Sequence, residues 1–158
     1  MKSVEWDDQA TVDGWVLGDG TVHKASNNLV LLDLGIKDGV FHSRFGKFVK
    51  RHRPGIKERD WEIHTTIKAN ELPRTWMRRI PDRFMRASSS VTASFLRGLY
   101  SANGSIAGGR IAFKTTSRGL VDDIQVLLSS LGISSYFTTN KASKVQWEEG
   151  VFESRESY

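Results

Sequence analysis

The chain has 158 residues, of which 39% are hydrophobic and 26% charged, a composition typical of one globular domain or two small fused halves. It contains no cysteine, which excludes a disulfide scaffold, and no apolar run approaches the roughly 20 residues that a membrane helix needs. We therefore expect an intracellular, cytoplasmic protein without a membrane partner. The 23 Lys and Arg residues exceed the 18 Asp and Glu residues, and the net charge of +5 favours a polyanionic partner.

The first half of the chain is predicted to alternate helices and strands. Phe41, Phe45, Phe48 and Val49 are spaced i, i+4, i+7 and i+8, which predicts an amphipathic helix. In chain order, the predicted elements are a helix over 12–20, a strand over 29–34, this helix over 41–49, a strand over 61–68 and a short helix over 72–80. A polar connector, 87–90, joins this half, 1–86, to the second half, 91–158.

The second half is predicted to repeat this order. The predicted elements are a helix over 96–104, a strand over 110–115, a helix over 120–131, and strands over 133–140 and 144–147. Gly132 is expected to end the helix before it. The order in each half is helix, two strands, helix, then one or two strands, which is an α+β layout with helices on one face of an antiparallel sheet. The second half lacks the closing helix of the first.

An internal repeat underlies this similarity. Residues 12–22 read VDGWVLGDGTV and residues 96–106 read LRGLYSANGSI, with matching glycine positions. The offset, 103 − 19, is 84 residues.

The repeat carries small residues at helical spacing. Gly14 and Gly18 are four residues apart, and Gly98 and Ala102 repeat this spacing, which lets two helix backbones approach closely. We predict that the two motif helices pack side by side on a local two-fold axis.

The motif helices each end at a polar residue followed by glycine. Gly20 and Gly104 are predicted to be left-handed C-terminal caps, which places Asp19 and Asn103 together at one end of the pair. A carboxylate there faces the negative end of the helix dipole, which costs a few tenths to about 1 kcal/mol unless a cation is bound. An oxygen-ligated Mg²⁺ would explain the choice of Asp19.

The two motifs resemble those of the LAGLIDADG homing endonucleases in their two-motif, single-chain form. Residues 12–20 and 96–104 occupy the nine motif positions, and the resemblance covers roughly residues 5–158. The second half is similar in particular to the endonuclease domains of ribonucleotide reductase inteins. This similarity rests on the segments SANGS (101–105), LLSSLGI (127–133), YFTTNK (136–141) and ESRESY (153–158).

The resemblance implies two α-β-β-α-β-β halves related by a pseudo-two-fold axis, a saddle of antiparallel sheets and motif helices packed at the centre. It implies a site-specific double-strand DNA endonuclease that hydrolyses phosphodiesters across the minor groove. The cofactor would be Mg²⁺, with Mn²⁺ as a substitute and with Ca²⁺ supporting binding without cleavage. The implied partner is a long, asymmetric double-stranded target bound by a monomer. The implied catalytic residues are Asp19, Asn103 and Lys68, and the implied metal ligands are Asp19, Asn103, Gly18 and Ala102.

Basic and polar side chains on the strands and after the first amphipathic helix are candidates for DNA contacts. Those in the first half are His23, Lys24, Ser26, Asn28, Arg44, Lys47, Lys50, Arg51 and Arg53. Those in the second half are Arg110, Lys114, Thr116, Thr138, Asn140, Lys141 and Lys144.

Several of these residues also have a purely structural interpretation. Asn103 departs from the Asp that the family usually has, so it could be a turn residue rather than a ligand. Lys68 could be a solvated strand end. A DNA-binding module of the same fold that has lost cleavage, such as a remnant, a regulator or a splicing cofactor, is therefore the alternative to an enzyme, and a packing domain with incidental charge is a third interpretation.

Overall fold

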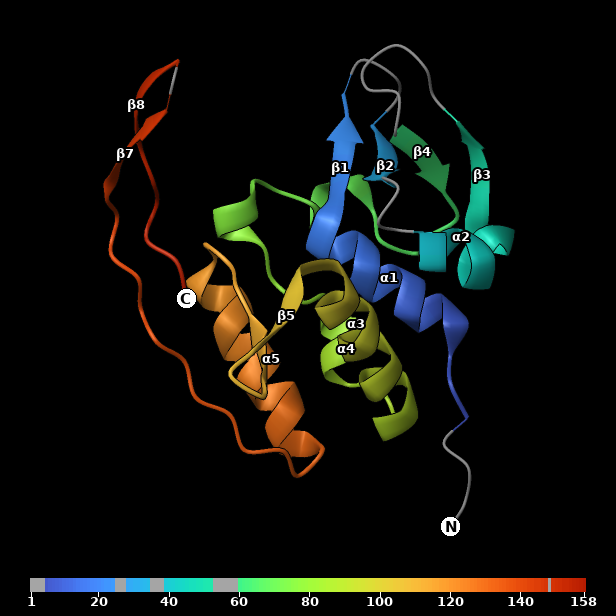
Figure 1. The fold of residues 1–158 in the computed structure, drawn as a ribbon. Coiled ribbons are helices and arrows are strands. Elements are labelled where there is room, and N and C mark those ends of the chain that lie inside the picture. The colour runs from blue at the N-terminus through green and yellow to red at the C-terminus, as the bar shows by residue number, and fades with distance from the viewer. Residues whose placement is uncertain (1–4, 25–27, 35–38, 53–59, 148) are drawn as a thin grey trace.

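The computed structural model describes residues 5–24, 28–34, 39–52, 60–147 and 149–158. It combines helices with antiparallel strands, which agrees with the predicted α+β class (Figure 1). Within the described residues, no helix is long and apolar enough to cross a membrane.

The first half contains one four-stranded sheet. Its elements are α1 (Asp8–Asp19), β1 (Gly20–His23), β2 (Leu29–Asp33), α2 (Gly39–Phe45), a 3₁₀ turn (Gly46–Phe48), β3 (Val49–His52) and β4 (Asp60–Ile63). The strand order is β1-β2-β4-β3, and every neighbouring pair is antiparallel. Asp7 caps α1, because its carboxylate accepts a hydrogen bond from the Ala10 N–H at 2.9 Å.

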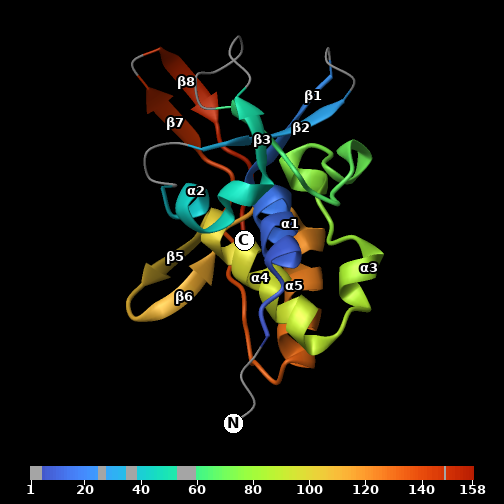
Figure 2. The same ribbon diagram turned by 90° about the vertical axis from the view of Figure 1, so that its right-hand side faces the viewer.

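The second half has the same order of elements but a different pairing of strands. Two 3₁₀ turns (Ala69–Glu71 and Thr75–Met77) and α3 (Asp82–Met85) lead into it. Its elements are α4 (Ser89–Asn103), β5 (Gly104–Ala107), β6 (Arg110–Phe113), α5 (Arg118–Ser130), β7 (Lys144–Trp147) and β8 (Gly150–Glu153). β5 pairs with β6 and β7 with β8 in two separate hairpins, which Figures 1 and 2 show well apart. A pseudo-two-fold relation between whole halves therefore stays a prediction.

The motif helices α1 and α4 lie against each other at the centre of the molecule (Figure 2), which confirms the expected close packing. A Cβ atom added to Gly14 would lie 1.9 Å from the Phe95 carbonyl oxygen. A Cβ atom added to Gly98 would lie 1.8 Å from the Thr11 carbonyl oxygen. Both distances are far below van der Waals contact, so only glycine permits this approach.

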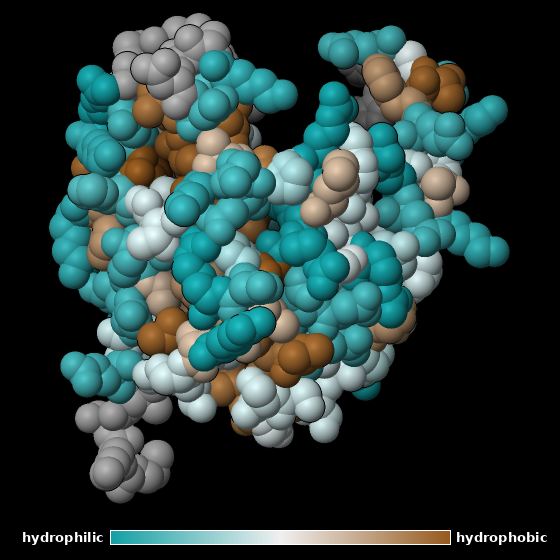
Figure 3. Space-filling view, turned by 180° about the vertical axis from the view of Figure 1, so that it is seen from behind, coloured by the Kyte–Doolittle hydropathy of each residue, from teal (hydrophilic) through white to brown (hydrophobic). Residues whose placement is uncertain are grey.

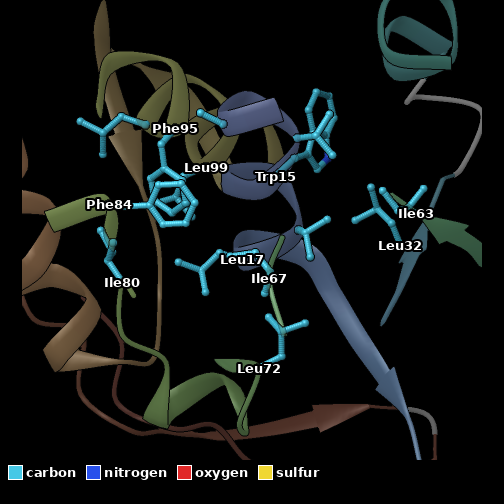
Figure 4. Packing of buried hydrophobic residues seen from close by; sticks show 14 of the residues in the cluster. Trp15, Leu17, Leu32, Ile63, Ile67, Leu72, Ile80, Phe84, Phe95 and Leu99 are labelled. Atoms are coloured by element: carbon cyan, nitrogen blue, oxygen red, sulfur yellow. The ribbon is translucent and has the colours of Figure 1, made fainter. Parts of the chain in front are cut away.

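The hydrophobic core runs from the sheet of the first half to the helices of the second. Figure 4 shows Leu32 and Ile63 of that sheet on one side of α1, and Phe84 and Phe95 on the other. The rings of Phe84 and Phe95 stack with centroids 4.2 Å apart. Since the cluster includes side chains from both halves, removing either half would expose apolar surface on the other.

Gly20 and Gly104 are not left-handed caps, which corrects the prediction. Their φ angles are −68° and −84°, and both residues are extended because each helix continues directly into a strand. Glycine is nevertheless required, since a Cβ at Gly20 would lie 2.4 Å from the Val16 carbonyl oxygen. Gly132, by contrast, has a φ of +76° and ends α5 as predicted.

Three predicted elements of the first half are wrong at their ends. The α-helix expected over 41–49 stops at Phe45 and tightens into a 3₁₀ turn. The strand expected over 61–68 ends at Ile63, after which the chain turns to bond with α1. The helix expected over 72–80 is only a 3₁₀ turn at Thr75–Met77, because the residues after it are drawn into contacts with α1 and α5.

The strand expected over 133–140 is absent as well. This segment runs past α5 with a single isolated backbone bridge, between Asn140 and Ser157. Side chains hold it instead: the guanidinium carbon of Arg118 lies 3.8 Å from the ring centroid of Phe137, and Arg110 donates to the Tyr136 hydroxyl at 2.6 Å. The alternating residue pattern of 133–140 thus accompanies side-chain contacts and does not form a β-ladder.

Candidate functional site

The C-terminal ends of the two motif helices meet. Asp19 is the last residue of α1 and is exposed, whereas Asn103, the last residue of α4, is half-buried. The Asn103 side-chain amide donates a hydrogen bond of 2.9 Å to the carbonyl oxygen of Gly18, next to Asp19. This bond joins the two helix ends, and it uses the amide nitrogen of Asn103.

A buried arginine, Arg78, holds the same end of α1. Its Nη1 donates to the carbonyl oxygens of Leu17 and Gly18, both at 2.7 Å, and its Nη2 donates to that of Gly20 at 2.6 Å. Arg78 is only 7% exposed. Burial lowers the pKa of its guanidinium below the ordinary value, while the nearby charge of Asp19 acts in the opposite direction. An arginine remains protonated under such conditions, so a positive charge lies beside Asp19.

Arg78 supplies a positive charge where the sequence predicted a bound metal ion. The charge of Asp19 and the α1 carbonyls were expected to need a bound cation, and the guanidinium already supplies one. The Gly18 carbonyl, a predicted metal ligand, accepts hydrogen bonds from both Arg78 and Asn103. A single arginine in a connecting segment carries no motif, so sequence analysis did not single out Arg78.

A pocket of about 240 Å³ opens beside this helix end. It is lined by Gly18, Thr75, Arg78, Asn103, Lys114, Thr115, Thr116, Leu120 and Ser157. Lys114 follows β6 and is exposed. The pocket therefore combines one amide, several hydroxyl groups and two cationic side chains, a set suited to an anion such as a phosphate.

Lys68, predicted to lie near the cleavage centre, is not among the residues that line this pocket. It is exposed at the start of the 3₁₀ turn Ala69–Glu71, where its backbone N–H donates to the Glu71 carboxylate at 2.9 Å. The basic side chains that the structure does bring to the pocket are Arg78 and Lys114, and the sequence had indicated only Lys114, as a DNA contact.

A second polar residue of the first motif, Asp13, is structural. It is 1% exposed and accepts hydrogen bonds from the Thr65 hydroxyl at 2.6 Å and from the Thr66 N–H and hydroxyl at 2.8 and 2.6 Å. Gln9 adds a fourth, at 3.1 Å. The carboxylate thereby anchors the chain after β4 to α1. Sequence analysis missed this role, although an acid on the packed face of a helix is the signal for it.

The basic residues predicted in the first half are distributed over several elements. His23 and Lys24 lie at the end of β1, Asn28 precedes β2, and Arg44 is exposed on α2. Three others form ion pairs: Lys47 with Asp8 at 2.8 Å, and Arg51 and Lys50 with Glu62 at 2.8 and 3.8 Å. Ser26 and Arg53 lie outside the described residues.

The face of the first sheet that is opposite the core also carries acids. The strand register puts Leu31, Glu62 and Arg51 in one row across β2, β4 and β3, on the side opposite Leu32. Asp33 pairs with Asp60 in the next hydrogen-bonded row of β2 and β4. Glu62 and Asp60 are only 8% and 4% exposed, so these carboxylates are largely covered, and Glu62 pairs with Arg51 and Lys50 instead of facing solvent.

The residues predicted in the second half are mostly exposed. Arg110 starts β6, and Thr116 lies in the pocket near Thr75, with hydroxyl oxygens 3.4 Å apart. Two of them, Thr138 and Asn140, lie on the extended segment 133–140. Lys141 comes directly after it, and Lys144 is the first residue of β7. In Figure 3 a hollow with mostly hydrophilic residues around it separates the first sheet from the β7–β8 hairpin. In Figure 1, β1 is the strand of the first sheet that lies on the side of this hairpin.

Residues 90–157 match the model of the LAGLIDADG-like domain, a range that begins at the second residue of α4 and includes β5 to β8. This match supports the LAGLIDADG family, which comprises homing endonucleases and related DNA-binding proteins. In the described part of the chain, no cluster of three or more His, Cys, Asp or Glu residues could hold a metal ion.

Proposed function

We propose that the protein is a site-specific DNA endonuclease of a homing element, of the intein type, with its cleavage centre at the joined ends of α1 and α4. The observation that carries the proposal is the hydrogen bond from Asn103 to Gly18, because it brings the last residues of both motif helices to one place. The domain match at residues 90–157 adds independent support for DNA as the substrate.

The residues at this end are compatible with a divalent cation. Mg²⁺ commonly keeps several waters and binds one or two carboxylates together with substrate phosphates, so it does not need a dedicated cage of protein ligands. Asp19 offers an exposed carboxylate, and Asn103, with its nitrogen bonded to Gly18, would offer its oxygen Oδ1. When bound, the ion would supply charge stabilisation for phosphodiester hydrolysis.

The protein side chains would do the rest by position and charge. Lys114, in the pocket beside Asn103, would pair with a DNA phosphate there, while Thr116 would donate a hydrogen bond to it. Basic residues of β1 and of the β7–β8 hairpin would contact the backbone on either side of the hollow. Since the two halves differ in sequence and in strand pairing, a monomer would read an asymmetric target.

The second candidate is a DNA-binding module that no longer cuts DNA. Two observations favour it: the Gly18 carbonyl accepts two hydrogen bonds, and the guanidinium of Arg78 lies beside Asp19. Both oppose the binding of a divalent cation at this position. In this case the same surfaces would bind DNA as a regulator, a splicing cofactor or a remnant of an endonuclease.

One experiment separates the two candidates. Random duplex DNA is selected for binding in Ca²⁺, and the selected fragments are then incubated with the protein in Mg²⁺ and in EDTA. For the endonuclease we expect cleavage in Mg²⁺ that EDTA abolishes, and that D19N abolishes without loss of binding. The matched control is D122N, which changes an exposed aspartate of α5 and should cut like the wild type.

The possible results have distinct meanings. Selected fragments that are bound but never cut would establish the binding module and reject the enzyme. Cleavage by D19N at the wild-type rate would reject Asp19 as the metal-binding residue of the cleavage centre. Failure to select any fragment would reject both candidates.

A further inference from the structure

We propose that Arg78 is a built-in counter-cation at the end of α1, which stabilises the helix end and the Asp19 carboxylate in the absence of any metal. The inference concerns the end of α1 itself, and it does not require that the protein cuts DNA. It rests on the proposed function only for its consequence, which is that a divalent cation would bind here weakly until DNA supplies further ligands.

The geometry of Arg78 supports this role directly. A helix leaves its last carbonyl groups without partners inside the helix, and these groups carry the negative end of its dipole. Arg78 donates to two of them, those of Leu17 and Gly18, and also to the carbonyl of Gly20, the first residue of β1. Two of these carbonyls belong to the residues on either side of Asp19, so the guanidinium is fixed beside the backbone of Asp19, and its charge interacts favourably with that of the carboxylate.

The burial of Arg78 carries an energetic cost that the surrounding groups must offset. Arg78 is 7% exposed, and its Nε has no hydrogen-bond partner among the described residues. A buried guanidinium with an unbonded nitrogen is costly and persists only where its other bonds and charges compensate. The compensation here is the carbonyl cluster together with Asp19.

Hydrogen bonds to the backbone of Arg78 and to the two residues after it hold this segment against α5. The Ser117 hydroxyl, which also caps α5 by accepting from the Leu120 N–H, donates to the Arg78 carbonyl oxygen at 2.7 Å. The neighbouring Arg79 and the Ile80 N–H both bond to the Asp123 carboxylate of α5. The arginine is therefore held between α5 and the end of α1.

The proposal predicts an exchange of one cation for another. In the wild type, Ca²⁺ without DNA should leave the melting temperature unchanged. In R78Q the helix end loses its cation, and the melting temperature should fall by roughly 6 to 12 °C. Ca²⁺ should then restore part of that loss, because a ligand that binds only the folded state raises its stability. NaCl at equal ionic strength should not.

Calcium titration by calorimetry, without DNA, gives the second measurement. We expect R78Q to bind Ca²⁺ roughly tenfold more tightly than the wild type or more, because a nearby positive charge has been removed. R78K keeps that charge and should bind Ca²⁺ like the wild type. The double variant R78Q/D19N should lose the gain, and R44Q, which changes an exposed arginine on α2, should behave as the wild type.

The proposal is overturned if Ca²⁺ does not stabilise R78Q, if R78Q binds Ca²⁺ no better than R78K, or if the wild type is itself stabilised by Ca²⁺ without DNA. Should R78Q fail to fold in buffer, its circular dichroism must recover in Ca²⁺ and not in NaCl, and recovery in neither also overturns it. None of these readouts measures cleavage. The outcome is thus independent of whether the protein proves to be an enzyme.

Discussion

Gly14 and Gly98 make reciprocal contacts. A Cβ on Gly14 would strike the Phe95 carbonyl and a Cβ on Gly98 would strike the Thr11 carbonyl. The two glycines are 98 − 14, or 84, residues apart, and Phe95 and Thr11 are separated by the same 95 − 11. Reciprocity of this kind is what a two-fold axis produces at an interface. The helix pair therefore obeys the sequence repeat, even though the sheets around it pair differently.

Gly14→Ala should destabilise the protein by about 3 kcal/mol or more, because the new methyl group meets backbone and cannot be accommodated by a rotamer change. Urea unfolding of the variant and the wild type measures the difference. Gly46→Ala is the control, since a Cβ there meets nothing within 4 Å. Equal losses in both variants would show that the close helix approach is not the cause.

Asp13→Asn should cost about 2 to 4 kcal/mol of unfolding free energy. The buried carboxylate accepts four hydrogen bonds, and the amide nitrogen of Asn would turn a donor toward the donors of Thr65 and Thr66. Urea denaturation at neutral pH checks this. Asp122→Asn, at an exposed pair with Arg118, should change stability by less than about 1 kcal/mol.

The rates of cutting the two strands should differ if the protein is an endonuclease. Asp19 would bring a full negative charge to a bound metal ion, whereas Asn103 would bring only a dipole. We expect a nicked intermediate on a supercoiled plasmid that carries the target. Asn103→Asp should speed the second cut, but it loses the hydrogen bond to Gly18 and should cost about 1 to 3 kcal/mol of stability. Equal strand rates in the wild type, measured on end-labelled duplex, would show that Asn103 is not limiting.

Lys114→Gln should weaken DNA binding and reduce the slope of log affinity against log salt concentration by about one, since one phosphate contact is lost. Glu62→Gln should act in the opposite direction, because it releases Arg51 and Lys50 from their ion pairs. Fluorescence anisotropy at several salt concentrations measures both slopes. An unchanged slope in Lys114→Gln would remove this residue from the DNA interface.

Glu71 should contribute a small, pH-dependent stability. Its hydrogen bond from Arg83 holds its pKa below the ordinary value of 4.5. The contribution is therefore complete above that value and is lost as the pH falls through the lowered pKa of the folded state. We expect Glu71→Gln to be less stable by up to about 1 kcal/mol at pH 7 and equal to the wild type in strong acid. A difference that persists at low pH would contradict this origin.

The sequence predicted those elements whose cause is local. The glycine spacing of the repeat predicted the packed helix pair, and the apolar spacing of 120–131 together with Gly132 predicted α5 and its end. Each signal is a spacing within one or two turns, and for the helix pair the same spacing occurs in both copies of the repeat. Where a segment is shaped by distant partners, the prediction was wrong: 133–140 alternates like a strand, but it is held by Arg118 and Arg110 and by one backbone bridge.

The candidate site divides in the same way. Asp19 and Asn103 could be found because both lie at fixed positions of a repeated motif. Arg78 and Lys114 could not be assigned to the pocket, since their place there depends on how the segment after β4 and the end of β6 fold back onto α1 and α4. The position of a basic residue in the sequence does not predict how these segments fold back. Lys68 was indicated instead by the family resemblance, because it lies at the end of the strand predicted over 61–68.

The packing of α1 against α4 also determines how the chain must reach its native state. The glycine contacts join residues about 84 positions apart, and the Asp7 N–H donates to the Ser94 hydroxyl across a similar separation. Contacts of such long range must close a large loop before they contribute any stability, which slows folding. During synthesis, α1 emerges long before α4, so its apolar side chains stay exposed until α4 has been made. We expect the first half alone to aggregate on release from the ribosome, and the chain to fold as one cooperative unit.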